Sequence, residues 1–246
     1  MKNLADKVAV VTGSSKGIGA AIAQQFAKAG AKLIVNYSGD EEAANTIVSG
    51  IRLNGGEAIA IKADVSKKND ITRLFDESIA HFGRIDIWVN NAGIMQNSLI
   101  KELSEEQFNR QLDVNFKGVF YSLQEAASKL EDNGSIINLS STVTRTMFPT
   151  YGVYSATKAA VEQMSRVFAK EIGARGINVN CVLPGPTGTD LFLAGKSEEQ
   201  ITQLTATNAF KRLGRPEDIA RVVVFLATEE AKWISGQCIG ANGGMA

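Results

Sequence analysis

Histidine and cysteine are nearly absent from this chain. His81 is the single histidine among 246 residues, and Cys181 and Cys238 are the only cysteines. A serine–histidine–aspartate hydrolase and a multi-histidine metal site are therefore disfavoured, and we expect no metal. His81 precedes Phe82-Gly83, where a helix is expected to end, and a partial positive charge is favourable at that place. Two cysteines in a chain of this size indicate reduced, structural thiols.

Long apolar runs and a net charge are also missing. No run of about 18 apolar residues could span a membrane, and the polar residues 1–6 lead directly into a strand-like segment. We therefore expect no signal peptide, no membrane partner and a cytoplasmic protein. The 26 Lys and Arg residues balance the 26 Asp and Glu residues, which argues against nucleic acid or anionic lipid as a partner.

Strand-like and helix-like segments alternate along the whole chain. Strands are predicted at 8–11, 33–35, 58–61, 85–89, 135–139, 177–182 and 237–240, and helices at 18–29, 41–53, 70–81, 104–130, 155–172 and 216–228. This alternation predicts an α/β fold, a Rossmann-like doubly wound parallel sheet with helices on both faces. With no linker or repeat in view, we expect residues 1–246 to form a single domain.

Unusual segments follow the predicted strands at their carboxyl ends, where ligands bind in such sheets. They are residues 13–19, 37–38, 64–65, 90–93, 140–141 and 184–185. The first has the spacing Gly13-x-x-x-Gly17-x-Gly19 between a strand and a helix. Glycines there let the backbone approach a pyrophosphate at the positive end of the helix, so the segment predicts a dinucleotide site. The spacing differs from the usual G-x-G-x-x-G.

Tyr154 and Lys158 are four residues apart in a predicted helix and share one face of it. A phenol with a pKa of about 10 is a weak acid near neutrality, and a neighbouring ammonium is expected to lower that pKa. Such a tyrosine can serve as general acid and base. Taken alone, the two residues could equally be an ordinary surface pair.

Taken together, these motifs resemble the short-chain dehydrogenase/reductase family in its single-domain form, over essentially the whole chain. The resemblance implies that Ser141 hydrogen-bonds a substrate carbonyl and that Tyr154 gives it a proton as hydride arrives from a nicotinamide. Lys158 would lower the phenol pKa and hold the nicotinamide ribose. Asn115, within the long predicted helix, would anchor a water in the proton relay.

The resemblance also implies a set of cofactor-binding residues. They are Gly13, Ser15, Lys16, Gly17, Ile18 and Gly19 in the first turn, Asp64 and Val65 at the adenine, Asn91, Ala92 and Gly93 at the adenosine ribose, and Pro184, Gly185, Thr187 and Thr189 at the carboxamide. Where NAD enzymes carry an acid at the end of the second strand, this chain has Tyr37 and Ser38. Together with the basic Lys16, this predicts NADPH as the cofactor rather than NADH.

The same resemblance assigns the substrate pocket to Met95, Gln96, Ser141, the loop from Val143 to Tyr151, Leu191 and Phe192, and a mobile lid to residues 188–210. The lining is mostly apolar, with Arg145 as a possible exception, and suits a hydrophobic ketone or aldehyde. An alternative branch is 3-oxoacyl-acyl-carrier-protein reductase. Its usual basic docking residues are replaced by the acidic end of Lys129-Leu130-Glu131-Asp132, although Arg175 keeps one basic position. We favour the broad carbonyl reductases.

Two further possibilities concern activity and assembly. A non-catalytic NADP-binding protein would typically lose the tyrosine or the lysine, and a sugar-nucleotide epimerase resembles a longer chain with different glycine spacing. Related enzymes usually form homotetramers through the helix of Asn115, the helix of Tyr154 and the last strand. We expect the same assembly here.

Overall fold

A parallel sheet of seven strands runs through the computed structural model, which describes residues 3–246. The strands are β1 (Val8–Val11), β2 (Lys32–Tyr37), β3 (Ala58–Lys62), β4 (Ile87–Asn90), β5 (Ser135–Leu139), β6 (Asn178–Pro184) and β7 (Cys238–Ala241). Their order is β3-β2-β1-β4-β5-β6-β7, and every pair is parallel. Strands β2 and β3 are added on one side of β1 and strands β4 to β7 on the other, which places the switch point between β1 and β4. The predicted doubly wound sheet is confirmed.

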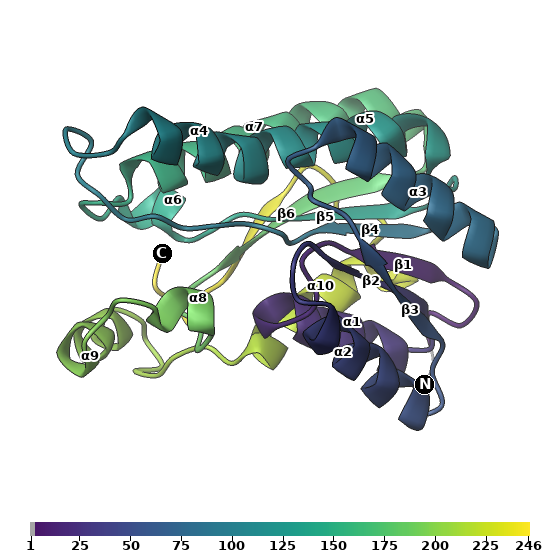
Figure 1. The fold of residues 1–246 in the computed structure, drawn as a ribbon, viewed down its shortest axis with the longest axis horizontal. Helices are drawn as coiled ribbons and strands as arrows, with labels where there is room; N and C mark the ends of the chain where they lie inside the picture. The colour runs from purple at the N-terminus through teal and green to yellow at the C-terminus, as the bar shows by residue number, and fades with distance from the viewer. Residues whose placement is uncertain (1–2) are drawn as a thin grey trace.

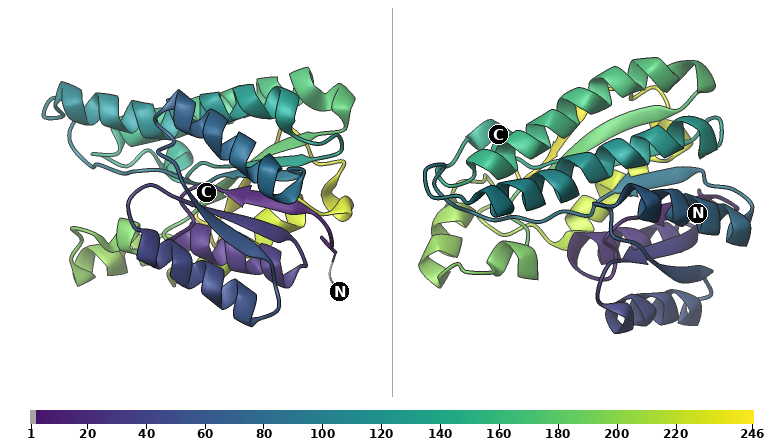
Figure 2. Two further views of the ribbon diagram at one scale, coloured as in Figure 1. Left: turned by 45° about the vertical axis from the view of Figure 1, so that its right-hand side comes forward. Right: turned by 45° about the horizontal axis from the view of Figure 1, so that its top comes forward.

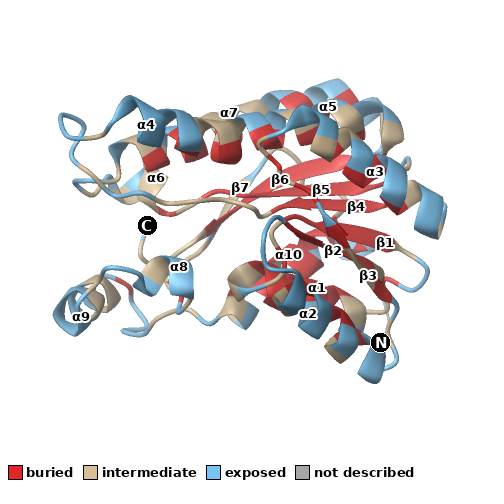
Figure 3. Cartoon of the chain, viewed as in Figure 1, coloured by how far each residue is buried: buried red, intermediate tan, exposed pale blue. Residues whose placement is uncertain are grey.

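Helices cover both faces of the sheet (Figures 1 and 2). One face carries α1 (Gly17–Lys28), α2 (Glu41–Leu53) and α10 (Pro216–Leu226), and the other carries α3 (Lys68–Phe82), α5 (Gly118–Lys129) and α7 (Gly152–Ile172). Strand β1 shows why two cores form. Ala9 and Val11 pack on the α1 side, whereas Val10 packs on the α7 side, as the alternation of a strand requires. Figure 3 shows the strands buried between the two layers.

The prediction of one continuous helix over residues 104–130 is wrong in one respect. A π-helical turn, Asp113–Lys117, separates α4 (Glu105–Leu112) from α5. No proline marks the interruption. The π-helical turn contains Asn115. The side-chain amide of Asn115 forms hydrogen bonds with the backbone of Ile94, outside its own helix. Such turns occur frequently at functional sites.

The remaining elements are short and lie between the larger ones. They are α6 (Val143–Thr146), α8 (Asp190–Leu193), α9 (Glu198–Ala206) and the 3-10 turns Gly173–Arg175 and Glu229–Ala231. The observed boundaries of β1, α2 and β5 equal the predicted ones, and the others differ by up to three residues. Helix α3 ends with His81 in its last turn and Gly83 in a left-handed C-cap. Among residues 3–246, none of the helices is both long and apolar enough for a membrane span.

Candidate active site

A cavity of about 680 Å³ opens at the carboxyl ends of the strands, around the switch point. Its walls come from the loops after β1, β2, β3, β4, β5 and β6, and from α7, α8 and α9. The sequence-predicted residues that line it are Gly13, Ser15, Lys16, Gly17, Ile18, Gly19, Tyr37, Ser38, Asp64, Val65, Asn91, Ala92, Gly93, Met95, Ser141, Val143, Tyr151, Tyr154, Lys158, Pro184, Gly185, Thr187, Thr189, Leu191 and Phe192. Gln96 and Asn115 lie outside this lining.

The glycine turn between β1 and α1 has room only for hydrogen at two positions. Gly13 has a φ of +59°, and a Cβ on it would lie 2.9 Å from the Cα of Ala92. A Cβ on Gly19 would lie 2.4 Å from the Gly13 carbonyl oxygen. The turn therefore exposes bare backbone at the positive end of a twelve-residue helix that borders the cavity. This shape and charge fit the pyrophosphate of a dinucleotide.

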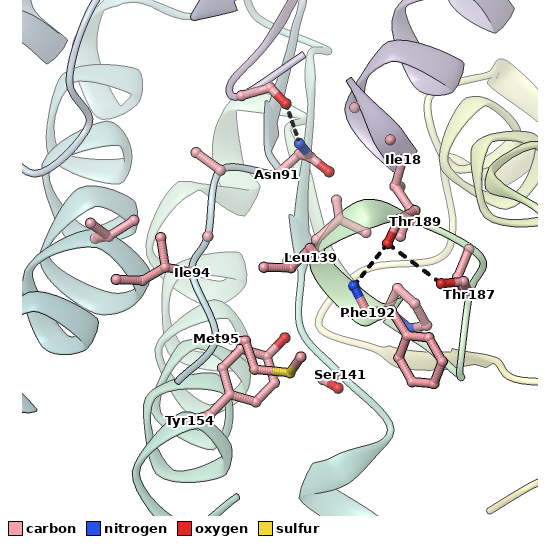
Figure 4. A pocket seen from close by; sticks show the side chains of 18 of the residues that line it. Ile18, Asn91, Ile94, Met95, Leu139, Ser141, Tyr154, Thr187, Thr189 and Phe192 are labelled. Atoms are coloured by element: carbon pink, nitrogen blue, oxygen red, sulfur yellow. Dashed lines mark hydrogen bonds between the residues drawn. The ribbon is translucent and has the colours of Figure 1, made fainter. Parts of the chain in front are cut away.

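Two polar side chains hold the glycine turn against the loop after β4. The Asn91 Nδ2 donates to the carbonyl oxygens of Thr12 and Gly13, each at 2.9 Å. The Thr12 Oγ1 accepts from the backbone nitrogens of Asn91 and Ala92, each at 3.0 Å. Figure 4 shows Asn91 directed at the turn. The predicted cofactor segments 13–19 and 91–93 are thus joined side by side.

Tyr154 and Lys158 lie on the cavity-facing side of α7, one turn apart. Both are nearly fully buried. The Lys158 Nζ lies 5.8 Å from the centre of the Tyr154 ring and donates to the Leu139 carbonyl oxygen at 2.8 Å. A Cβ on Gly93 would lie only 3.4 Å from this Nζ, so the absence of a side chain there leaves room for the ammonium group.

The expected lowering of the tyrosine pKa is wrong for this structure. Burial raises the pKa of Tyr154 to about 12, and the interaction with the nearby Ser141 hydroxyl opposes that rise. Burial also lowers the pKa of Lys158 to about 8, because desolvation disfavours the ammonium form. Figure 4 shows the Tyr154 and Ser141 hydroxyls on the same side of the cavity.

Asn115 lies outside the cavity lining and forms hydrogen bonds with residues on two segments that border the cavity. Its Oδ1 accepts from the Ile94 nitrogen and its Nδ2 donates to the Ile94 carbonyl oxygen, both at 2.9 Å. The Nδ2 also lies 3.3 Å from the Thr157 hydroxyl on α7. The side chain therefore fixes the loop after β4 relative to the helix that carries Tyr154.

The part of the cavity near Tyr154 is aromatic and aliphatic. The rings of Phe148 and Tyr154 each lie 6.5 Å from the Tyr151 ring, centre to centre. Met95, Leu191 and Phe192 border the same space, and the last two belong to α8, whose N-cap is Thr189. Figure 4 shows Met95 and Phe192 beside the cavity. Gln96 is exposed, and its backbone nitrogen donates to Gln111. Arg145 is directed at Glu162, at 3.5 Å, and does not line the cavity.

The opposite end of the cavity carries the residues predicted to determine whether NADPH or NADH binds. Lys16 is exposed at the N-terminus of α1, and Ser38 is exposed just after β2. The next carboxylate along the chain, Asp40, is the N-cap of α2, and its Oδ1 accepts from the Ala43 nitrogen at 3.0 Å. Arg110 of α4 borders the cavity near Asp64, with 3.9 Å between the guanidinium and the carboxylate.

Comparison with known proteins identifies the family. Residues 13–246 match the family model described as enoyl-(acyl carrier protein) reductase. An uncharacterized oxidoreductase of Methylorubrum extorquens is 45% identical over 247 residues, covering 100% of both chains. The chain belongs to the short-chain dehydrogenase/reductase family. Versicolorin reductase of Emericella nidulans is 41% identical to this dehydrogenase/reductase over 97% of the chain and 95% of the relative.

Solved structures of the short-chain dehydrogenase/reductase family superimpose closely on this one. A family member from Serratia marcescens gives a TM-score of 0.95 with 36% identity, covering 99% of each chain. One from Burkholderia cenocepacia in complex with NADP gives 0.94 with 34% identity, again covering 99% of each. The angucycline C-6 ketoreductase LanV with bound NADP gives 0.94 with 38% identity, covering 99% of this chain and 96% of that one.

Several residues at the site of this short-chain dehydrogenase/reductase were not predicted from the sequence. Asn36 ends the apolar run of β2, and its buried amide accepts from the Gly13 nitrogen and donates to the Ala63 carbonyl oxygen. A polar residue in an otherwise apolar strand was the signal available for it. Phe148 lines the cavity from the predicted 143–151 loop, and Leu204 lines it from the predicted 188–210 segment. Met245 also lines the cavity, and nothing in its local sequence marks it.

Proposed function

We propose that this protein transfers hydride from NADPH to the carbonyl carbon of a hydrophobic ketone or aldehyde and so forms an alcohol. The observation that carries the proposal is the placement of Tyr154, Ser141 and Lys158 in one cavity with the glycine turn of residues 13–19. A proton donor, a hydroxyl partner and a cation thus face the same space as a backbone cradle suited to a dinucleotide. We assign the whole chain, 1–246, to one catalytic domain.

Each polar group at the reacting end has a distinct part in the proposed reaction. When bound, the nicotinamide supplies the hydride. Ser141 donates a hydrogen bond to the substrate carbonyl oxygen, and the Tyr154 phenol gives that oxygen its proton. A pKa of about 12 keeps Tyr154 protonated, as an acid must be before it acts. Asn115 anchors a water in the relay that returns the proton.

Lys158 orients the cofactor in this proposal. Its ammonium group donates to the ribose hydroxyls beside the nicotinamide, in addition to the Leu139 carbonyl oxygen that it already meets. With a pKa of about 8, Lys158 is roughly nine-tenths charged at neutral pH.

Preference for NADPH is supported by the charges at the far end of the cavity. The exposed Lys16 ammonium and the Ser38 hydroxyl are available to a 2′-phosphate. The Asp40 carboxylate keeps its charge while it caps α2 and also lines the cavity, so it opposes this preference. The NADP complexes of the Burkholderia cenocepacia enzyme and of LanV are consistent with this choice.

A free carbonyl compound is favoured over a carrier-bound substrate because the basic residues near the end of α5 are occupied. The Arg175 Nε donates to the Asp132 carboxylate at 2.7 Å, and its other nitrogens donate to carbonyl oxygens at the end of α5. The Lys129 ammonium pairs with Asp76 and Glu125. An acidic carrier would have to compete with these internal partners. The ring pair Phe148 and Tyr151 suits an aryl ketone.

Residues 188–210 are proposed as a lid over the substrate. This segment contains α8 and α9 and contributes Leu191, Phe192 and Leu204 to the cavity. We also propose a homotetramer, because α4, α5 and α7 expose Phe108, Phe120 and Val167 by 43%, 44% and 48%. Light scattering after size-exclusion chromatography measures that assembly directly.

Initial rates of NADPH and NADH oxidation test the function. The substrate panel comprises aryl ketones, aldehydes, 3-oxoesters and one 3-oxoacyl thioester. We expect broad turnover of the simple carbonyls with NADPH. A strong preference for the thioester would transfer the protein to the carrier-dependent branch, and no turnover with either cofactor would overturn the proposal.

A further inference from the structure

Glu162 is a buried carboxylate that the proposed reaction does not use. It lies on α7 one turn beyond Lys158 and two turns beyond Tyr154, so the three side chains share one face of the helix. Its side chain is 6% exposed. It is absent from the cavity lining, whereas its partner Ser140 lines the cavity. A charge buried in this way is retained only where donors compensate it.

The donors of Glu162 come from the turn that carries Ser141. The hydroxyls of Ser140 and Thr144 both lie 2.7 Å from the same oxygen, Oε1, one on each side of Ser141 in the sequence. Hydrogen bonds to a carboxylate are shorter and stronger than those between neutral groups. The Oε2 atom faces the guanidinium groups of Arg145 and Arg166, at 3.5 and 4.0 Å.

One carboxylate oxygen of Glu162 therefore bridges the hydroxyl groups of residues 140 and 144. The Thr144 hydroxyl also lies 3.0 Å from the Ser141 carbonyl oxygen, and the Thr144 nitrogen donates to that oxygen at 3.2 Å. The Ser141 backbone is thereby fixed from both sides, while its own hydroxyl remains directed at the cavity beside Tyr154 (Figure 4).

We propose that Glu162 is a positioning residue that fixes the turn 140–144 on α7 and so holds the Ser141 hydroxyl in register with the Tyr154 phenol. The inference rests on the proposed carbonyl reduction. Tyr154 and Glu162 belong to the same helix, α7, so a turn bound to Glu162 keeps a fixed position relative to the Tyr154 phenol. Removal of the carboxylate releases the turn without touching the acid, the lysine or the dinucleotide cradle.

The test is a double-mutant cycle between Glu162 and Ser141, measured as kcat and KM for an aryl ketone with NADPH. We expect Glu162→Ala to lower kcat about tenfold or more while the KM for NADPH stays within about twofold. We expect the double variant Ser141→Ala/Glu162→Ala to be no slower than Ser141→Ala alone, because Glu162 acts only through Ser141. Glu162→Gln keeps an acceptor oxygen for both hydroxyls and should recover most of the rate.

Two controls separate positioning from folding. Glu171→Ala changes an exposed glutamate on the same helix and should leave kcat and the melting temperature unchanged. If Glu162→Ala does not fold, Thr144→Val and Ser140→Ala remove the same contacts from the other side and enter the same cycle. A folded Glu162→Ala with wild-type kcat, or effects that multiply in the double variant, would overturn the inference. A wild-type rate in Ser141→Ala would instead overturn the role of Ser141 in the proposed function.

Discussion

The buried ammonium of Lys158 should make stability depend on pH in a defined window. Burial lowers the Lys158 pKa from 10.5 to about 8 in the folded protein. Between those two values the unfolded chain binds more protons than the folded one, so the free energy of unfolding rises with pH there. Below pH 8 both states hold the proton, and the burial cost of the charge is present in full.

The size of the effect follows from the two pKa values. Their difference, about 2.5 pH units, corresponds to about 3 kcal/mol in total, since one unit is worth about 1.4 kcal/mol. Between about pH 7.5 and about pH 10, the part recovered is about 2 kcal/mol. This window stays below the raised pKa of Tyr154, about 12, so the folded phenol remains neutral throughout it.

Lys158→Met isolates this contribution, because methionine keeps an unbranched side chain without the titrating group. Urea unfolding of both proteins across the window gives two curves of stability against pH. Their difference cancels every other group that titrates alike in both. We expect the wild type to gain about 2 kcal/mol on the variant from low to high pH. A difference that stays constant, or falls, would refute the burial argument for Lys158.

The remaining predictions concern catalysis and the cofactor. Tyr154→Phe should preserve folding and NADPH affinity but lower kcat by about 10²–10⁴, since only the proton donor is lost; retained turnover in a folded variant would contradict the assignment. Gly19→Ala places a Cβ 2.4 Å from the Gly13 oxygen and should abolish NADPH binding, measured by fluorescence titration. The control Gly50→Ala, with open space around the new Cβ, should leave NADPH binding intact and stabilise α2 by about 0.5–1 kcal/mol. Lys16→Ala should raise the KM for NADPH about three- to tenfold and leave that for NADH unchanged, with Lys28→Ala at the other end of α1 as control; equal effects on both cofactors would remove Lys16 from phosphate recognition.

The fold could be predicted from the sequence because most strands can be recognised there as short apolar runs. Val8–Val11 is buried on both faces, and every predicted strand except the last is followed by a helix pattern. The candidate site was equally accessible, since a parallel sheet brings the carboxyl ends of its strands to one edge. The glycine turn and Asn91 are therefore neighbours although 78 residues separate Gly13 from Asn91.

Features that depend on packing were not predictable in the same way. The pKa of Tyr154 was expected to fall because spacing shows the neighbouring lysine, whereas the burial that raises it becomes visible only in the folded chain. Met245 reaches the cavity through tertiary contacts alone. The π-helical turn lacked a clear sequence signal as well, because its five residues contain neither proline nor glycine.

That turn constrains how the chain can vary in length. A π-helical turn holds one more residue than an α-helical turn, so α4 and α5 are out of phase by about one residue, or roughly 100° of rotation. Deleting one residue between 113 and 117 would restore a continuous α-helix and keep the buried face of α5, with Val119 and Leu123, against the sheet. The same deletion would remove the wide turn from which the Asn115 amide reaches the Ile94 backbone. A deletion here should therefore leave the fold intact and disturb the loop that borders the site.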